Sequence, residues 1–455
     1  MKLRAALPPG QHAAPAALAL LALVYVLLAA LPAAAGSDLV LATAPPPDGA
    51  GESPDWLLGP LRAFGLDGAD GPLAGPLFYA GLWLALGLYV VVLLRVAQLT
   101  RRTAVVAIVG LHVLFLLAPP LLSQDVFSYI AYARIGVEHS LNPYTTAPLD
   151  VPSDAVFGFA GSKNAVSVYG PAFTLISYPI ALLGVAGAFW TLKAIAALAS
   201  LAIVWIVWRL AERLGRDPLL PALAVGINPL VLVHVVAGAH NEALVVLVTM
   251  AGVGLFVLGH QARSAALATA AAALKASAGL VVPFLALGSP PGSAVVPGSP
   301  ERRRAALRAL AAAAGAGLAI ALVALAGFGS HALDALGLLS SNQERSSRWS
   351  FPYKTAELLG ALLPGDRLDY RAAVRTLFAL AFAAVFVSLL WQTWRGADAI
   401  AMAGWATLAI LVASAWLVPW YALWLLPLAA LAADRRLLWA SVALCAWMLV
   451  IAVPL

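Results

Sequence analysis

Charged residues are scarce in this sequence. Only 11% of the 455 residues are charged and 62% are hydrophobic, whereas an average soluble domain carries roughly 25% charged residues. This shortage excludes a water-soluble fold, because too few polar side chains are present to cover its surface. Apolar runs of about 20 residues have the length that crosses a membrane core about 30 Å thick. The sequence therefore predicts an all-α polytopic membrane protein with about 12 to 14 membrane helices or half-helices.

Cysteines, internal repeats and nucleotide-binding motifs are also scarce or missing. Cys445 is the single cysteine, so no internal disulfide can form. No inverted or parallel repeat is visible. The sequence contains neither a Walker A motif nor a GxGxxG motif in a soluble βαβ unit, and no cytosolic segment is long enough for a nucleotide-binding domain. Any activated donor must therefore come from the membrane.

The basic residues predict the topology. The net charge is +6, and the basic residues lie in short loops between apolar runs. Basic residues in such loops indicate the cytoplasmic face of a membrane protein and not a nucleic-acid partner. The predicted inner clusters are 101–102, 209–216, Arg263, 302–308, Arg395 and 435–436. They leave outside the segments 123–170, the neighbourhood of His240, 330–370 and 416–421. This topology requires segment 171–188 to be re-entrant or interfacial, and predicts a hairpin around Lys275.

The N-terminal part, residues 1–75, is predicted to contain one helix followed by an outer loop rich in Pro and Gly. Residues 1–35 have the features of either a signal peptide or a first membrane helix. The apolar stretch from Ala16 to Leu31 is longer than the usual signal core of about 7 to 15 residues, which favours the helix. Together with residues 76–455 it is predicted to form a single integral membrane domain, 1–455.

The richest polar segment begins at Asp125. Read as a helix, Asp125, Ser128, Tyr129 and Tyr132 share one face at i, i+3, i+4 and i+7. The opposite face is apolar, so the segment is predicted to be an amphipathic helix at the outer interface that directs an acid and several hydroxyls at one spot. The alternative is an interfacial helix whose aspartate caps its own N-terminus and whose tyrosines belong to an aromatic belt.

A second polar segment is His240-Asn241-Glu242, at the outer end of one apolar run and the start of the next. Its three side chains could supply hydrogen bonds to a polyol, or Asn241 and Glu242 could simply cap the following helix. His234 and His240 are six residues apart, which does not fit a zinc motif. No metal site and no cofactor are predicted, and the residues do not indicate a divalent cation.

The remaining candidates are cations and aromatic residues. Lys275 lies in an alanine-rich apolar run, where an ionisable residue is a functional candidate unless it reaches a headgroup. Arg345 and Arg348 lie in a predicted outer loop, and their guanidinium groups suit phosphate oxygens, although a solvated loop is the simpler interpretation. Trp420 and Tyr421 belong either to an aromatic girdle or to a platform that stacks on a sugar or isoprenoid.

These segments together resemble a known enzyme family. The chain resembles, from about residue 76 onward, the polyprenol-phosphate-mannose-dependent α-1,6-mannosyltransferases, which belong to the GT-C superfamily of integral membrane glycosyltransferases. The residues that carry the resemblance are Gln124-Asp125, Tyr129, Tyr132, Arg134, Asn142-Pro143-Tyr144, Tyr169-Gly170-Pro171, Asn228-Pro229, 238–242 and Pro419-Trp420-Tyr421. Glu242 departs from the aspartate expected in the histidine-asparagine motif.

The resemblance implies a GT-C-like fold over residues 76–455 and an active site at the outer face of the plasma membrane. It implies a polyprenyl-phosphate-linked sugar donor, with mannose expected as the sugar, a glycan or lipoglycan acceptor, inversion at the sugar, and Asp125 as general base. The substrate-binding residues expected around it are Tyr129, Tyr132, Arg134, Asn142, Tyr144, Tyr169, His240, Asn241, Glu242, Lys275, Arg345, Arg348, Trp420 and Tyr421. A polytopic transporter or lipid flippase is the main alternative. A structural scaffold would leave the outer polar motifs unexplained.

Overall fold

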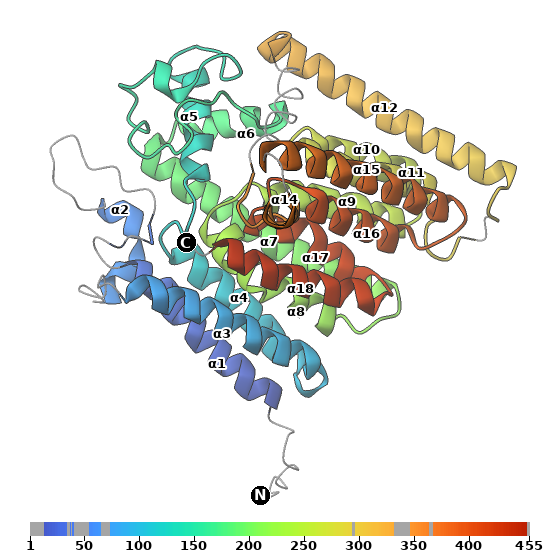
Figure 1. Cartoon of the computed structure of the whole chain (residues 1–455), viewed down its shortest axis with the longest axis horizontal. Coiled ribbons are helices and arrows are strands. Elements are labelled where there is room, and N and C mark those ends of the chain that lie inside the picture. Colours follow the sequence, from blue (N-terminus) through green and yellow to red (C-terminus); the bar gives the residue numbers. More distant parts are fainter. Residues whose placement is uncertain are drawn as a thin grey trace, which may run out of the picture.

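The protein is described from a computed structural model. It covers residues 13–33, 37, 39–40, 54–64, 73–293, 296–331, 346–363 and 367–452. Within these ranges every regular element is a helix or helical turn, and no strand occurs (Figure 1). This result confirms the all-α prediction.

The helices follow one another with short connections, many of them ended by glycine at positive φ or begun by a capping Ser, Thr or Asp. They are α1 (Ala13–Ala30), α2 (Asp55–Leu58), α3 (Ala74–Leu94), α4 (Arg101–Leu117), α5 (Asp125–Val137), α6 (Pro171–Ala181), α7 (Gly184–Arg213), α8 (Leu219–Gly226), α9 (Glu242–Val257), α10 (Gln261–Ala272), α11 (Val282–Leu287), α12 (Pro300–Phe328), α14 (Phe351–Leu362), α15 (Arg367–Trp394), α16 (Ala399–Ala413), α17 (Ala422–Leu431) and α18 (Arg435–Ala452).

Several helices have the length and composition of membrane spans. Among the described residues, 5 helices meet both criteria: Ala13–Ala33, Ala74–Leu94, Gly184–Arg213, Pro300–Phe328 and Tyr370–Trp394. The bent pair of α8 and Val231–Ala237 raises the number to 6 if it forms one span. Further apolar helices are shorter. The chain is thus a multi-pass membrane protein, while a total of about 12 to 14 helices or half-helices stays a prediction.

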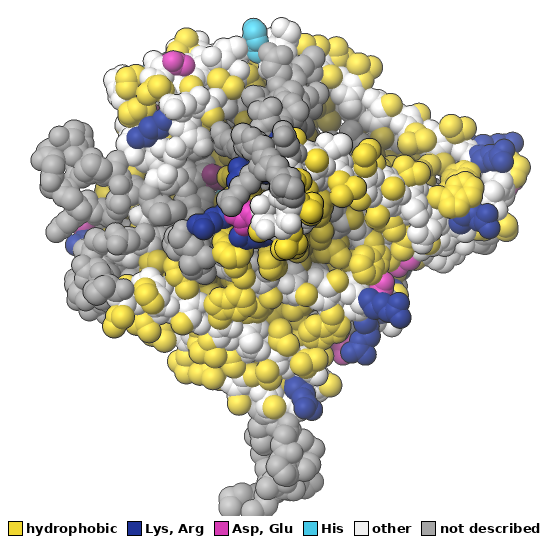
Figure 2. Space-filling model, viewed as in Figure 1, with side chains coloured by type: hydrophobic (Ala, Val, Ile, Leu, Met, Phe, Trp, Pro, Cys, Tyr) yellow, Lys and Arg dark blue, Asp and Glu magenta, His cyan; other side chains and the backbone are white. Residues whose placement is uncertain are grey.

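The outermost helices expose their apolar side chains. Only 11% of the apolar stretch of α12 is buried inside the protein, and the same fraction holds for α15. Leu318 and Leu322 of α12 and Leu380 of α15 are more than half exposed. Figure 1 shows α12 along one edge of the molecule, and Figure 2 shows a broad hydrophobic surface. Such surface is stable where lipid tails cover it.

The predicted inner clusters gather at one end of the helices. Arg101 at the start of α4 pairs with Glu212 near the end of α7 at 3.1 Å. The Nη2 atom of Arg302 in the first turn of α12 donates to the carbonyl of Thr393 near the end of α15 at 2.7 Å. Figure 2 shows basic side chains at the right of the molecule, over the right-hand end of α12, and others along the lower right. The positions agree with the grouping predicted from charge.

The segment 171–188 contains a short helix, as its predicted failure to span requires. With 11 residues, α6 is about 16 Å long, well below the roughly 30 Å of a membrane core. The break lies at residues 182–183, earlier than predicted, because Gly184 already begins the 30-residue α7.

The predicted hairpin around Lys275 is present. The Nε2 atom of Gln261, at the start of α10, donates to the carbonyls of Ala286 at 2.8 Å and Gly288 at 2.7 Å, at the end of α11. The chain therefore returns to its starting level within about 25 residues. Lys275 lies between the two arms, at the tip.

Buried tyrosines support the bend between α8 and the helical turn Val231–Ala237. The two segments meet at 58°, and the break at Asn228-Pro229 frees carbonyl groups. The hydroxyl of Tyr25 donates to the Ile227 carbonyl and that of Tyr89 to the Ala224 carbonyl, each at 2.7 Å. Since a membrane interior offers no water to these carbonyls, the tyrosines stabilise the bend that leads to His240.

Candidate active site

The turn that begins α5 is held by a buried lysine. After α4 ends at Leu117, the chain passes through Pro119 and Pro120, which cannot continue the helix. The Nζ atom of Lys193, a fully buried residue of α7, donates to the carbonyls of Ala118 and Pro119. This contact satisfies carbonyls left free by the helix end and fixes the turn that presents Asp125.

Protein surrounds the apolar face of α5. Val126 and Phe127 on its apolar face are 0% exposed. Phe127 stacks on Phe159 and Phe189, with ring centroids 5.3 and 5.6 Å apart. Protein therefore covers the apolar face of this amphipathic helix, and its position at the outer membrane interface stays a prediction. The polar face that includes Asp125 does line a cavity.

Asp125 is the first residue of α5, but its carboxylate does not cap the helix. The N-cap is Gln124, and no side-chain capping bond is present there. The half-buried carboxylate is thus available for chemistry, against the capping alternative. The pKa of Asp125 is raised to about 6, first by burial and then by the negative charge of Glu242, while the charge of Lys275 opposes the shift.

Asp125 opens into a cavity of about 520 Å³. Five other predicted site residues line this cavity: Tyr132, Tyr169, Lys275, Trp420 and Tyr421. Sequence reasoning did not commit to the remaining polar and aromatic side chains at its wall, which are Ser128, Ser162, Ser277, Ser414, Trp416 and Trp424. The position of Ser128 on the Asp125 face and the cluster of tryptophans around Pro419 were the signals that could have included three of them.

His240 lies beside Asp125 and Glu242. Its ring stacks on Trp420 with centroids 3.9 Å apart. Its Nδ1 atom lies 3.6 Å from Oδ2 of Asp125 and 3.6 Å from Oε2 of Glu242. Burial lowers the pKa of His240 well below its usual value, and the nearby Lys275 charge lowers it further. His240 is therefore a neutral ring that separates two carboxylates.

Glu242 and Lys275 form a buried ion pair beside this ring. Glu242 is 0% exposed, and Nζ of Lys275 donates to its Oε1. The same Nζ lies 5.2 Å from the ring centre of Tyr421 and 5.8 Å from that of Trp424, within range of cation–π attraction. Burial alone would lower the pKa of Lys275, but Glu242 raises it above the usual range. Lys275 is thus a fixed cation at the cavity wall.

Several buried polar atoms at this site have no hydrogen-bond partner in the described part of the chain. They are both ring nitrogens of His240, both amide atoms of Asn241, and Oε2 of Glu242. Asn241 is the N-cap of α9, yet its side chain makes no capping bond. The capping alternative for Asn241 therefore fails. Unpaired buried polar groups are costly, and a catalytic or binding role is one reason for a protein to retain them.

Two glycines bring the site together. The amide of Gly170 donates to the carbonyl of Leu274, at the tip of the Lys275 hairpin, at 3.1 Å. A Cβ atom at Gly170 would lie 2.6 Å from the carbonyl carbon of Ala273 and closer still to its oxygen. At Gly238, a Cβ atom would lie 2.9 Å from the ring of His240. The close approach of these segments requires glycine at both positions.

Tyr129 and Arg134 lie outside the cavity wall. Tyr129 is buried beneath it, and its hydroxyl accepts from the amide of Asn241 at 3.4 Å. Arg134 pairs instead with Asp154 in the following loop, its Nε donating to Oδ1 at 2.8 Å. Asp154 also accepts from the amide of Val156, so this pair shapes the loop.

The Asn-Pro-Tyr segment also serves packing in this structure. Nδ2 of Asn142 donates to the carbonyl of Phe328, at the end of α12, at 2.8 Å. The hydroxyl of Tyr144 donates to the carbonyl of Tyr169 at 2.9 Å. Arg348 is exposed and does not line the cavity. Arg345 lies outside the described residues.

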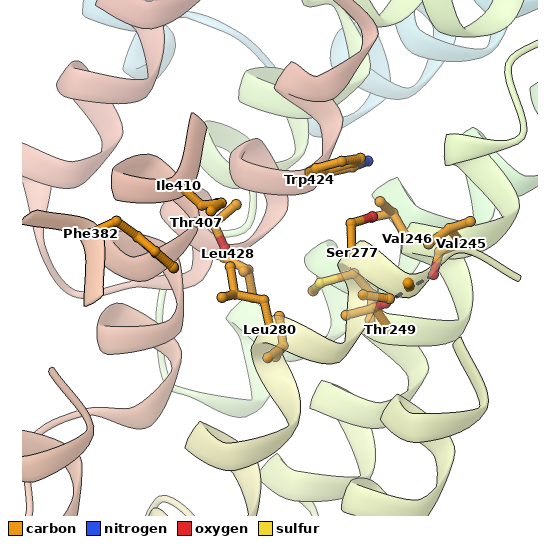
Figure 3. A pocket seen from close by; sticks show the side chains of 14 residues that line it. Val245, Val246, Thr249, Ser277, Leu280, Phe382, Thr407, Ile410, Trp424 and Leu428 are labelled. Atoms are coloured by element: carbon orange, nitrogen blue, oxygen red, sulfur yellow. Dashed lines mark hydrogen bonds between the residues drawn. The ribbon is translucent and has the colours of Figure 1, made fainter. Parts of the chain in front are cut away.

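A second, apolar cavity of about 270 Å³ adjoins the first (Figure 3). The two share Ala276, Ser277, Ile410 and Trp424 in their walls. The other lining residues are mostly aliphatic, and the hydroxyls of Thr249 and Thr407 already donate to backbone carbonyls. The site thus combines a polar chamber beside Asp125 with an apolar chamber that suits a hydrocarbon chain.

Metal ligands are not gathered here. Across the described ranges, no group of three or more His, Cys, Asp or Glu side chains is placed to hold a metal ion.

Comparison with known proteins identifies the family. Residues 34–289 match the model of the alpha-(1->6)-mannopyranosyltransferase N-terminal domain, and residues 358–455 match the model of the MptB C-terminal domain. The chain is 31% identical to alpha-(1->6)-mannopyranosyltransferase A of Mycobacterium tuberculosis over 82% of its own length and 73% of that protein. It is 28% identical to alpha-(1->6)-mannopyranosyltransferase A of Corynebacterium glutamicum over 41% of its length and 38% of that protein.

No solved structure gives a significant match to the chain. The family matches and the extensive similarity to the mycobacterial protein agree with the membrane architecture and with the resemblance seen in the motifs. The chain therefore belongs to the alpha-(1->6)-mannopyranosyltransferase family and is a membrane hexosyltransferase.

Proposed function

We propose that this mannosyltransferase moves mannose from a polyprenyl-phosphate donor to a hydroxyl of a glycan or lipoglycan acceptor, with Asp125 as general base. The observation that carries the proposal is the cavity in which Asp125 faces Lys275 and a wall of stacked aromatic rings. A carboxylate with a pKa near 6 is suited to accept a proton at neutral pH. Aromatic rings such as Trp420 offer flat surfaces for a sugar ring.

The proposed step is a single displacement. The acceptor oxygen attacks C1 of mannose on the face opposite the phosphate, and Asp125 takes the hydroxyl proton. The bond between C1 and the phosphate oxygen breaks, and its electron pair leaves with the polyprenyl phosphate. Attack from the opposite face inverts a β-linked donor to an α-linked product. No nucleotide and no cofactor is required for this balance.

Lys275 is the proposed partner of the donor phosphate. It is the one Lys or Arg among the described residues that line the cavity. An ammonium group near the leaving phosphate stabilises the negative charge that develops on it. Arg348, predicted for this role, is exposed and outside the cavity wall, and it retains no support from the structure as a phosphate ligand.

The adjoining apolar cavity is the proposed position of the first isoprene units. Its wall is shared with the polar chamber at Ser277 and Trp424, so one ligand with a charged head and an apolar tail would fit both. The transporter and flippase alternative accounts for the helices but not for a base, a cation and an aromatic wall in one chamber. The family membership favours the transferase.

The test is transfer of labelled mannose from polyprenyl-phosphate mannose to an α-mannoside in membranes that contain the full chain. Asp125→Asn should lower the rate by about 10²- to 10⁴-fold or more, because asparagine cannot take the proton. Asp217→Asn is the matched control. Asp217 lies outside the cavity, in the connection between α7 and α8, and the asparagine oxygen can still accept from the amide of Leu219, so the rate should stay at the wild-type value. An Asp125→Asn rate within a few-fold of wild type would refute the base assignment.

The proposed outer position of the site is tested by cysteine labelling after Cys445→Ser. Ser153 is exposed on the loop that follows α5, and Ser293 is exposed near the predicted inner end of α12. Ser153→Cys should react with a reagent that does not cross membranes, and Ser293→Cys only after the membrane is disrupted. The reverse pattern would place the active site on the cytoplasmic side.

A further inference from the structure

A cavity of about 410 Å³ lies at the end of the molecule opposite the active site. It is formed by the connections that join α7 to α8, α11 to α12, and α15 to α16, and its polar lining includes Arg216, Arg302, Ser289 and Asp398. The 29 residues of α12 begin beside this cavity at Pro300 and end near Asn142. At 1.5 Å per residue, this helix is about 43 Å long, so the cavity and the loop that follows α5 lie at its opposite ends.

Arg302 is the central feature of the cavity wall. Only 2% of its surface is exposed. Its Nη2 atom donates to the carbonyls of Leu287 and Thr393, which anchors the guanidinium group between the ends of α11 and α15. Its Nε and Nη1 atoms donate to no acceptor in the described part of the chain. Buried donors without acceptors are costly, so this geometry favours a ligand that can accept from them.

The charges in the cavity favour an anion. Neither Arg216 nor Arg302 forms an ion pair within the described ranges, and Nη1 of Arg216 donates to the Leu431 carbonyl. Asp398, the acidic residue in the described wall, already accepts from the amides of Ile400 and Ala401 at the start of α16. Two guanidinium groups therefore face one carboxylate that serves as a helix cap. Guanidinium groups bind phosphate oxygens with matching geometry.

We propose that Arg302 and Arg216 form a second phosphate-binding site, distinct from the mannosyl-transfer site and independent of the proposed reaction. Its ligand class is a phosphate group, carried either by an anionic lipid headgroup or by a soluble phosphate. Basic pockets between membrane helices at the inner face are suited to anionic headgroups. Arg216 and Arg302, which line the cavity, both belong to the basic clusters that the sequence assigns to that face.

The test uses the purified full chain in detergent and measures binding of phosphatidylglycerol, phosphatidylcholine and inorganic phosphate in separate titrations. Arg302→Gln and Arg216→Gln should each weaken phosphatidylglycerol binding about tenfold, equivalent to about 1.4 kcal/mol. Arg303→Gln is the matched control: it removes the same charge from the next residue of α12, which is exposed, and should change binding less than about twofold. Phosphatidylcholine, which has no net charge, should bind more weakly than phosphatidylglycerol.

The titrations distinguish the two sources of phosphate. Arginine-dependent binding of phosphatidylglycerol alone identifies a lipid headgroup, and arginine-dependent binding of inorganic phosphate in lipid-free detergent identifies a soluble phosphate. Because Arg302 also anchors two helix ends, the thermal unfolding midpoint of each variant is measured, and Arg216→Gln supplies a test that leaves that anchor in place. The proposal is overturned if Arg216→Gln binds both ligands as the wild type does, or if Arg303→Gln loses as much binding as the cavity variants.

Discussion

The ion pair between Lys275 and Glu242 gives the sharpest test of the site geometry. Glu242 is 0% exposed and the side chain of Lys275 is 20% exposed. Removing one partner of a buried pair leaves an uncompensated charge and costs about 3–5 kcal/mol, whereas replacing both partners with neutral residues is much less costly. Lys275→Met should therefore lower the free energy of unfolding by about 3–5 kcal/mol. Glu242→Gln should cost less, because the remaining ammonium still contacts the cavity.

The double variant, with both substitutions, should be more stable than Lys275→Met alone, because no buried charge remains in it. Unfolding of the full chain in detergent can be followed by tryptophan fluorescence, since the sequence contains 14 tryptophans. Lys354→Met is the matched control: it removes a lysine that pairs at 2.7 Å with Glu357, whose side chain is 39% exposed. The carboxylate left behind reaches water, so the loss should be about 1 kcal/mol or less. If the double variant loses the sum of the two single losses, the pair is not coupled and the described geometry is wrong.

Three further outcomes are expected. The rate of transfer should rise about tenfold between pH 5 and pH 7, because Asp125 with its raised pKa of about 6 must lose its proton to act as base; a rate that is flat across this range would contradict the assignment. Gly170→Ala should lower the thermal unfolding midpoint and the transfer rate, because its Cβ overlaps a backbone carbonyl of the Lys275 hairpin, while Gly87→Ala, which has open space, should not. Tyr129→Phe should cost only about 0.5–1.5 kcal/mol in a stability measurement, because it removes one long hydrogen bond; a loss comparable to Lys275→Met would show a larger role.

Local pattern was sufficient to predict several of the side chains that share one cavity. Spacing along one helix face identified Asp125 and Tyr132. Lys275 and His240, each singled out from its own segment, lie beside Asp125 in the structure. Charge separated the two ends of the helices, because clusters of arginine such as those at Arg101 and Arg302 gather at one of them. These predictions depend on periodicity and composition, which act over short stretches of chain.

Contacts between distant segments could not be predicted in this way. The apolar face of α5 is covered by Phe159 and Phe189, and no local pattern states which segment will cover a helix face. Arg134 shows a different limit: it lies nine residues after Asp125, which at about 100° per residue places it on the opposite side of the helix. The structure accordingly pairs it with Asp154. Helical geometry, applied to every residue of the motif, would have separated the two.

The electrostatic balance of the cavity connects the pair of carboxylates with the proposed reaction. Asp125 and Glu242 both lie near His240, and a single described cation, Lys275, stands at the same wall. The negative charge of Glu242 is, after burial, the second cause of the raised pKa of Asp125. A phosphate group brought to this wall would likewise be repelled while both carboxylates are ionised. In the proposed step, Asp125 becomes neutral as negative charge accumulates on the leaving phosphate. Lys275 is then balanced against Glu242 and the phosphate alone, so proton transfer to Asp125 and departure of the phosphate each lower the electrostatic cost of the other.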